Sequence, residues 1–127
     1  MSLGNAFPVR STVPDLTVVT GLWTGGGAAA DMSVTSGDWN KGIASVAYNA
    51  ATGKYLITFV DVGADIVHCE AKVHRPTSGD DPIGSNILIG TFSRTAKTVE
   101  VEFGATLVDI DTDEKVSFFF LFAKNSP

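Results

Sequence analysis

The stretch KVSFFFLFAK, residues 115–124, decides the fold class, because it is apolar at nearly every position over the length of one β-strand. Alternate side chains of an extended strand point to opposite faces. One face then carries Phe118, Phe120 and Phe122, and the other carries Phe119, Leu121 and Ala123. A strand that is apolar on both faces is predicted to be central in a two-layer sandwich, with one face in the core.

The second face of this strand needs a cover. Burial of a Phe side chain contributes about 1.5–3 kcal/mol, so a row left in water would lose several kcal/mol and favour aggregation. The cover is either the chain's own N-terminal arm or loop, or a neighbouring subunit or larger assembly. We expect an assembly and keep the arm as the alternative.

Short strands separated by turn signals are expected along the rest of the chain. The turn AATG, with Gly53 available for a positive φ, and the turn VGA around Gly63 both predict hairpins. No segment shows a helical period, so the fold class is all-β: a single antiparallel sandwich, jelly-roll-like, with a small barrel as the alternative. The expected strands are 15–23, a brief one near 31–35, 43–49, 54–61, 65–74, 86–93, 97–109 and 115–124.

The segment KTVEVEFGATL, residues 97–107, shows the alternation of a half-buried strand. Glu100 and Glu102 are expected on a wet face, and the opposite face is expected to carry Val99, Val101, Phe103, Ala105 and Leu107.

Length and composition limit the class of protein. The 127 residues fit one domain, which we place at 15–127, after an extended arm at 1–14 that contains Pro8 and Pro14. One cysteine allows no internal disulfide. The net charge of −5 and nine scattered Lys and Arg residues predict no nucleic-acid partner. The absence of an apolar run of signal-peptide or membrane-span length predicts a soluble product made in a cytoplasm, with no membrane partner.

The stretch VHCEAKVHR, residues 67–75, resembles a metal or acid-base site in composition only. Strand alternation places His68, Glu70, Lys72 and His74 on one face, and Val67, Cys69, Ala71 and Val73 on the other. Six residues separate the histidines by about 20 Å along a straight strand, too far for one metal ion. We therefore expect a half-buried strand here, although a residue from elsewhere in the fold could complete a site around one histidine.

Other candidate chemistry is weak, so we expect no enzyme, no cofactor and no metal. The acidic stretch VDIDTDEK, residues 108–115, lacks the glycine and the terminal bidentate carboxylate of a calcium loop and is predicted to be a hairpin turn. No serine lies in a nucleophile elbow, and GGG at 25–27 lacks the lysine of a phosphate loop. Core packing is the ordinary role of the aromatic residues, with sugar stacking as the alternative for Trp23, Trp39, Tyr48 and Tyr55.

Four phrases of the chain carry a resemblance to a known family: TGKYLITFVD, HCEAKVHRP, TVEVEFGATLVD and KVSFFFLFAKNS. From residue 15 onward the chain resembles the small all-β virion proteins of tailed bacteriophages, of the capsid decoration, or cement, type. This resemblance implies a homotrimer seated on the outer surface of the phage head, an arm that reaches over neighbouring coat subunits, and no catalytic residues. The two histidines of residues 65–74 depart from the family's pattern.

The expected function is therefore that of a capsid decoration protein, made in the host cytoplasm, whose partners are its own copies and the major capsid protein. A carbohydrate- or receptor-binding module of a phage head or tail fibre is the alternative, and an enzyme is a third. The candidate interface residues are Phe7, Pro8, Trp23, Phe118, Phe119, Phe120 and Phe122.

Overall fold

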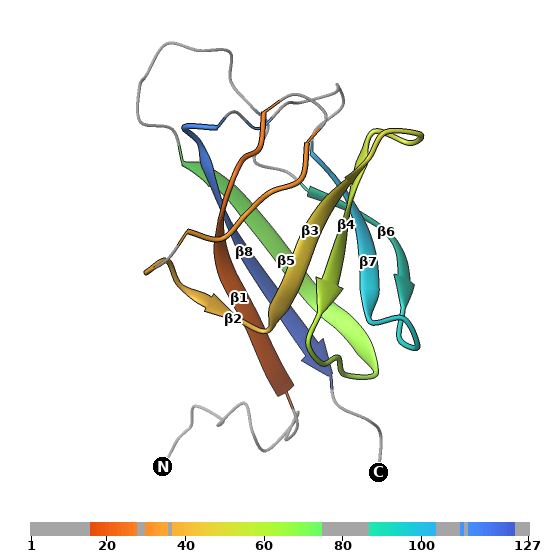
Figure 1. Cartoon of the computed structure of the whole chain (residues 1–127). Helices are drawn as coiled ribbons and strands as arrows, with labels where there is room; N and C mark the ends of the chain where they lie inside the picture. Colours follow the sequence, from red (N-terminus) through yellow and green to blue (C-terminus); the bar gives the residue numbers. More distant parts are fainter. Residues whose placement is uncertain are drawn as a thin grey trace.

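The computed structural model describes residues 16–27, 30–35, 37–74, 87–103, 110 and 112–123. It consists of two antiparallel four-stranded sheets, in the orders β2-β1-β8-β5 and β3-β4-β7-β6 (Figure 1). The prediction of an all-β sandwich is confirmed, whereas the predicted arm at 1–14, with Phe7 and Pro8, lies outside the described residues. The strands are β1 (Leu16–Thr24), β2 (Asn40–Lys41), β3 (Ile43–Asn49), β4 (Lys54–Phe59), β5 (Asp65–His74), β6 (Ile87–Ser93), β7 (Thr98–Phe103) and β8 (Lys115–Ala123).

Strand β8 is central in the first sheet, as its sequence predicts. It pairs with β1 from Leu16↔Ala123 to Thr24↔Lys115 and with β5 on its other side. Its inner face packs against the second sheet, where the Phe59 ring meets the Phe120 and Phe122 rings edge to face at centroid distances of 5.0 and 5.1 Å. Such contacts between aromatic rings stabilise a core beyond the area they bury.

Strand β7 supplies the opposite wall of the core. Val99, Val101 and Phe103 are buried, while Glu100 and Glu102 alternate with them and are half-exposed. The predicted alternation is therefore confirmed over β7, and its continuation through Ala105 and Leu107 lies outside the described residues.

The turn at AATG joins β3 and β4 as a hairpin, and Gly53 takes a positive φ of 72°, as predicted. The hairpin predicted around Gly63 is wrong, because β4 already pairs with β3 and β7 and has no free edge for β5. The chain instead crosses to the other sheet there. A Cβ on Gly63 would lie 2.2 Å from the carbonyl oxygen of Ala123, so this close approach of two backbones requires glycine.

The strand predicted near 31–35 is not present as a strand. Ser33 forms a single bridge with Thr24 of β1, and the preceding Met32 forms one with Val46 of β3. Because consecutive residues bond to different sheets, the segment cannot continue a ladder with either. It runs across one side of the sandwich (Figure 1), and β2 follows it on the edge of β1.

Candidate functional site

The outer face of the first sheet is the candidate functional surface, because its apolar side chains are not enclosed by the core. Residues on β1 and β8 that point away from the second sheet include Val18, Leu22, Phe119 and Leu121. Val18 has 51% of its surface exposed, and the other three are half-buried. These four side chains define what we call the apolar outer face.

The outer face of the second sheet is different in character. Leu56 lies there among hydroxyl and carboxylate side chains contributed by β3, β4 and β7, which include Ser45, Thr58, Glu100 and Glu102. The second sheet therefore has a polar outer face, whereas the outer face of the first sheet is apolar over β1 and β8 and polar over β5. An apolar face of this kind is typical of a surface that meets another molecule.

The structure separates the predicted interface residues into two groups. Trp23, Phe118, Phe120 and Phe122 lie in the core between the sheets, with 4% exposure or less, so one folded chain does not offer them to a partner. Phe119 lies on the outer face and is half-buried. The His68 ring covers part of it, edge to face, with the two ring centroids 6.3 Å apart. An interface role stays a prediction for all seven residues, and among the five that the structure describes, Phe119 is the one with access to a partner.

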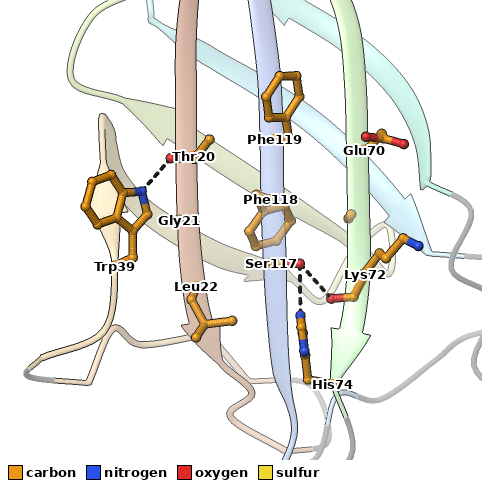
Figure 2. A pocket seen from close by; sticks show the side chains of 11 residues that line it. Thr20, Gly21, Leu22, Trp39, Glu70, Lys72, His74, Ser117, Phe118 and Phe119 are labelled. Atoms are coloured by element: carbon orange, nitrogen blue, oxygen red, sulfur yellow. Dashed lines mark hydrogen bonds between the residues drawn. The ribbon is translucent and has the colours of Figure 1, made fainter.

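A groove of about 500 Å³ lies on the same face, towards the end of the sheet where β5 terminates (Figure 2). Phe119 and Ser117 of β8 form its middle, β1 lies on one side, and β5 lies on the other. Its lining includes Thr20, Leu22, Trp39, Glu70, Lys72, His74, Ser117 and Phe119.

Trp39 forms the wall of the groove beyond β1 and is 61% exposed. Its indole N–H donates a hydrogen bond to Thr20 Oγ1 at 2.6 Å, and Lys41 Nζ lies 5.7 Å from the ring centroid. The hydrogen bond fixes the orientation of an exposed aromatic ring. Among the four aromatics considered for stacking, Trp23 and Tyr55 are buried in the core and Tyr48 packs against Tyr55.

The polar side chains of β5 form the opposite wall. His74 Nε2 and Ser117 Oγ are 3.0 Å apart and share a hydrogen bond, and His68 Nε2 lies 3.7 Å from Glu70 Oε2. No group of three His, Cys, Asp or Glu side chains in the described part of the chain is placed to hold a metal ion.

A β-bulge at Val67 changes the predicted alternation of this strand. The register shifts between Ile66 and His68, which leaves Val67 57% exposed instead of on the face of Cys69. From His68 to His74 the alternation is as predicted, with the polar residues outward. The bulge was not visible in the sequence because an extra residue changes the side-chain period only locally.

Cys69 points towards the core and not towards the histidines. Burial of the thiol, followed by repulsion from the Glu70 carboxylate, raises the pKa of Cys69 from 9.0 to about 12. A protonated thiol is a poor nucleophile and a poor metal ligand. The geometry therefore gives Cys69 a packing role.

The acidic stretch 108–115 is described only in part, since Asp109 and Asp111 lie outside the described residues. Asp113 is exposed in a turn, but the predicted hairpin is wrong, because β7 and β8 lie in different sheets. Glu114 is buried. The Lys115 ammonium forms an ion pair with Asp38 at 2.8 Å, which ties β8 to the segment that carries Trp39.

The sequence interpretation missed the contribution of β1 to this surface. The alternation of Leu16, Val18, Thr20 and Leu22 in DLTVVTGLW was the available signal, because pairing with β8 places these residues beside Phe119 and Leu121. The contact between Trp39 and Thr20 depends on the path that the chain takes before β2. The sequence of that segment has no periodic pattern from which this path could be predicted.

Comparison of the chain with known protein families, with curated proteins and with solved structures gives no match. Among the described residues there is no helix long and apolar enough to cross a membrane.

Proposed function

We propose that this chain is a non-catalytic structural protein that attaches to a larger protein assembly through its apolar outer face. The observation that carries the proposal is the half-buried Phe119 on the outer side of the central strand, continued by Val18 and Leu121 on the same face. A neighbouring molecule that covered this patch would remove apolar surface from water, which is the main favourable contribution to protein association.

The resemblance to tailed-phage decoration proteins supplies the finer part of the proposal. On that basis the assembly is a phage capsid, the partner is the major capsid protein, and the chain acts as a homotrimer that stabilises the shell from outside. Repetition over many sites would strengthen attachment, since linked contacts add as avidity.

Binding to capsids that lack the protein tests this proposal. Val18→Lys places a charge on the exposed apolar outer face and is expected to weaken capsid binding by at least about tenfold, because a desolvated charge without a partner is unfavourable at an interface. Leu56→Lys is the matched control on the polar face and is expected to bind like the wild type. Binding that is equally strong in both variants, or absent in the wild type, would contradict the proposal.

A carbohydrate-binding module is the second candidate, and one specific observation favours it. The fixed, exposed ring of Trp39 stands across a groove from hydrogen-bonding side chains of β5. A glycan array would detect this function, and Trp39→Ala is expected to abolish the signal while Val18→Lys, outside the groove, preserves it. The structural function would be favoured if Val18→Lys loses capsid binding and the wild type gives no signal on the glycan array.

A further inference from the structure

The outer edge of β5 is a second surface, distinct from the apolar outer face. β5 has ten residues and is the last strand in the order β2-β1-β8-β5. Among the described residues no strand or loop makes backbone hydrogen bonds with this edge. An exposed edge strand presents a row of N–H and C=O groups that can pair with another strand.

The opposite side of the sandwich is closed by backbone hydrogen bonds, in contrast to the open edge of β5. There the segment 30–41 bonds along β1, where Leu22 N–H donates to Trp39 O at 2.7 Å and Thr24 N–H donates to Ser33 O at 2.6 Å. The same segment reaches β3 through the Met32 N–H, which donates to Val46 O at 3.0 Å. The fold thus protects one side with its own backbone and leaves β5 without such a cover in the part that is described.

Proteins commonly protect an open edge by charge and by bulges. β5 has both, with a bulge at Val67 and the charged residues Glu70 and Lys72 on its outer face. The bulge limits regular pairing to the seven residues from His68 to His74. Ala71 lies at the middle of these seven residues.

A two-fold axis at Ala71 would therefore pair the whole regular stretch of β5 with the same stretch of a second copy, in antiparallel orientation. In this register Glu70 of each chain faces Lys72 of the other, so two pairs of opposite charges form. A slip of the partner by two residues places Glu70 opposite Glu70, or Lys72 opposite Lys72. Since like charges directly opposite each other are unfavourable, the charges select the register that also gives the longest ladder.

The side chains are positioned for such contacts. Glu70 and Lys72 are exposed, and Figure 2 shows both leaning away from β8 towards the free edge of β5. Within the described structure the only salt-bridge contact of either residue joins Glu70 Oε2 and His68 Nε2 at 3.7 Å, and it is an ion pair only when His68 is protonated. On the inner face the half-buried Cys69 of each chain would meet the half-buried Val73 of the other, which continues the core across the axis.

We propose that two copies of this chain pair through their β5 edges about a two-fold axis at Ala71, which joins their first sheets into one continuous sheet. The contact does not use the apolar outer face and does not depend on the proposed function. If a trimer forms by other surfaces, the same edge links chains of neighbouring trimers.

Charge exchange at the edge tests the pairing, with the mass of the full chain measured by sedimentation velocity from 10 µM to about 1 mM. Glu70→Lys and Lys72→Glu each turn both facing pairs into like charges and are expected to weaken self-association by about tenfold. The double variant Glu70→Lys/Lys72→Glu restores both pairs in exchanged positions and is expected to associate like the wild type. An equimolar mixture of the two single variants is also expected to associate, because every facing pair is then opposite in charge.

Matched controls change the net charge by the same amount at other positions. Asp113→Lys corresponds to Glu70→Lys, and Lys54→Glu corresponds to Lys72→Glu; both are expected to keep the wild-type mass. Circular dichroism confirms that each variant is folded, which is expected because both edge residues are exposed. A wild type with the mass of its single variants at every concentration, or a mixture that fails to recover the wild-type mass, would overturn the proposal.

Discussion

At the scale of single residues, the position of Cys69 leads to a prediction about pH. Its pKa is raised to about 12 in the folded chain, so folding favours the protonated thiol. The stability that this group contributes is fully present below the ordinary thiol pKa of 9.0 and is lost as the pH rises from there towards 12. Cys69→Ala is expected to reduce the fall in the free energy of unfolding over this window, as measured by urea denaturation at pH 8, 9, 10 and 11.

The same residue can be followed by its chemistry. At pH 8 the native thiol is expected to react with a disulfide reagent at least about tenfold more slowly than the thiol in urea, since only the thiolate attacks. Equal rates in the native and unfolded chains would show that Cys69 is accessible and unperturbed.

The backbone around Gly63 leaves no room for a side chain. An added Cβ would lie 2.2 Å from the Ala123 carbonyl oxygen and 2.9 Å from the Cβ of Phe122, so β8 and the turn would have to separate. Gly63→Ala is expected to lower the free energy of unfolding by about 2–3 kcal/mol, in the range of overpacked cores. Gly90→Ala, where the nearest atom lies 3.2 Å away on Glu100, is the matched control with an expected loss below about 1 kcal/mol.

At the scale of elements, the two faces of β8 are expected to differ in energy. Phe120 is fully buried between the sheets, and Phe120→Ala should cost about 3–5 kcal/mol because it removes the ring and leaves a cavity. Phe119→Ala on the outer face should cost about 1 kcal/mol, because that ring is half-buried in a single chain. Guanidinium denaturation followed by tryptophan fluorescence measures both. A loss of 3 kcal/mol or more for Phe119→Ala would mean that the outer ring is as fully packed as the inner one.

The segment before β2 is held to β8 by charge. Lys115 Nζ lies 3.1 and 2.8 Å from the two carboxylate oxygens of Asp38, whose side chain is only 17% exposed. Asp38→Ala and Lys115→Ala are each expected to destabilise the chain by about 1 kcal/mol, and the double variant should lose less than the sum. Additive losses in this double-mutant cycle would show that the two charges do not interact in solution.

Regular periodicity made most strands predictable. β7 and the His68–His74 part of β5 follow from alternation, and β8 follows from its continuous apolar run. The AATG turn between β3 and β4 follows from the need for a positive φ at Gly53. The segment 30–41 was not predictable, because its bonds to β1 and β3 are made by single residues instead of a repeating pattern. The groove depends on this segment, so the sequence indicated Trp39 as a candidate but not the wall it forms.

At the scale of the whole molecule, the sandwich has two unlike faces and two unlike sides. The outer face of the second sheet is polar, while that of the first is apolar over β1 and β8. The side formed by β1 and β3 is closed by the segment before β2, while the outer edge of β5 has no backbone partner in the described structure. The surplus of apolar residues in KVSFFFLFAK predicted one of these differences. The difference between the two sides depends on strand order, because β5 pairs only with β8 and so lies at the edge of its sheet.

The pairing of the first strand with the last has a practical consequence for protein engineering. Leu16 and Ala123 are direct cross-strand partners, so their Cα atoms are about 5 Å apart. A circular permutant that joins these two positions by a short glycine-serine linker, with new termini opened in the exposed turn at residues 50–52, should fold to the same sandwich and retain its thermal transition within a few degrees. The same adjacency means that cargo fused at either of these positions would emerge from one pole of the molecule, at the far end of the first sheet from His74 and the groove.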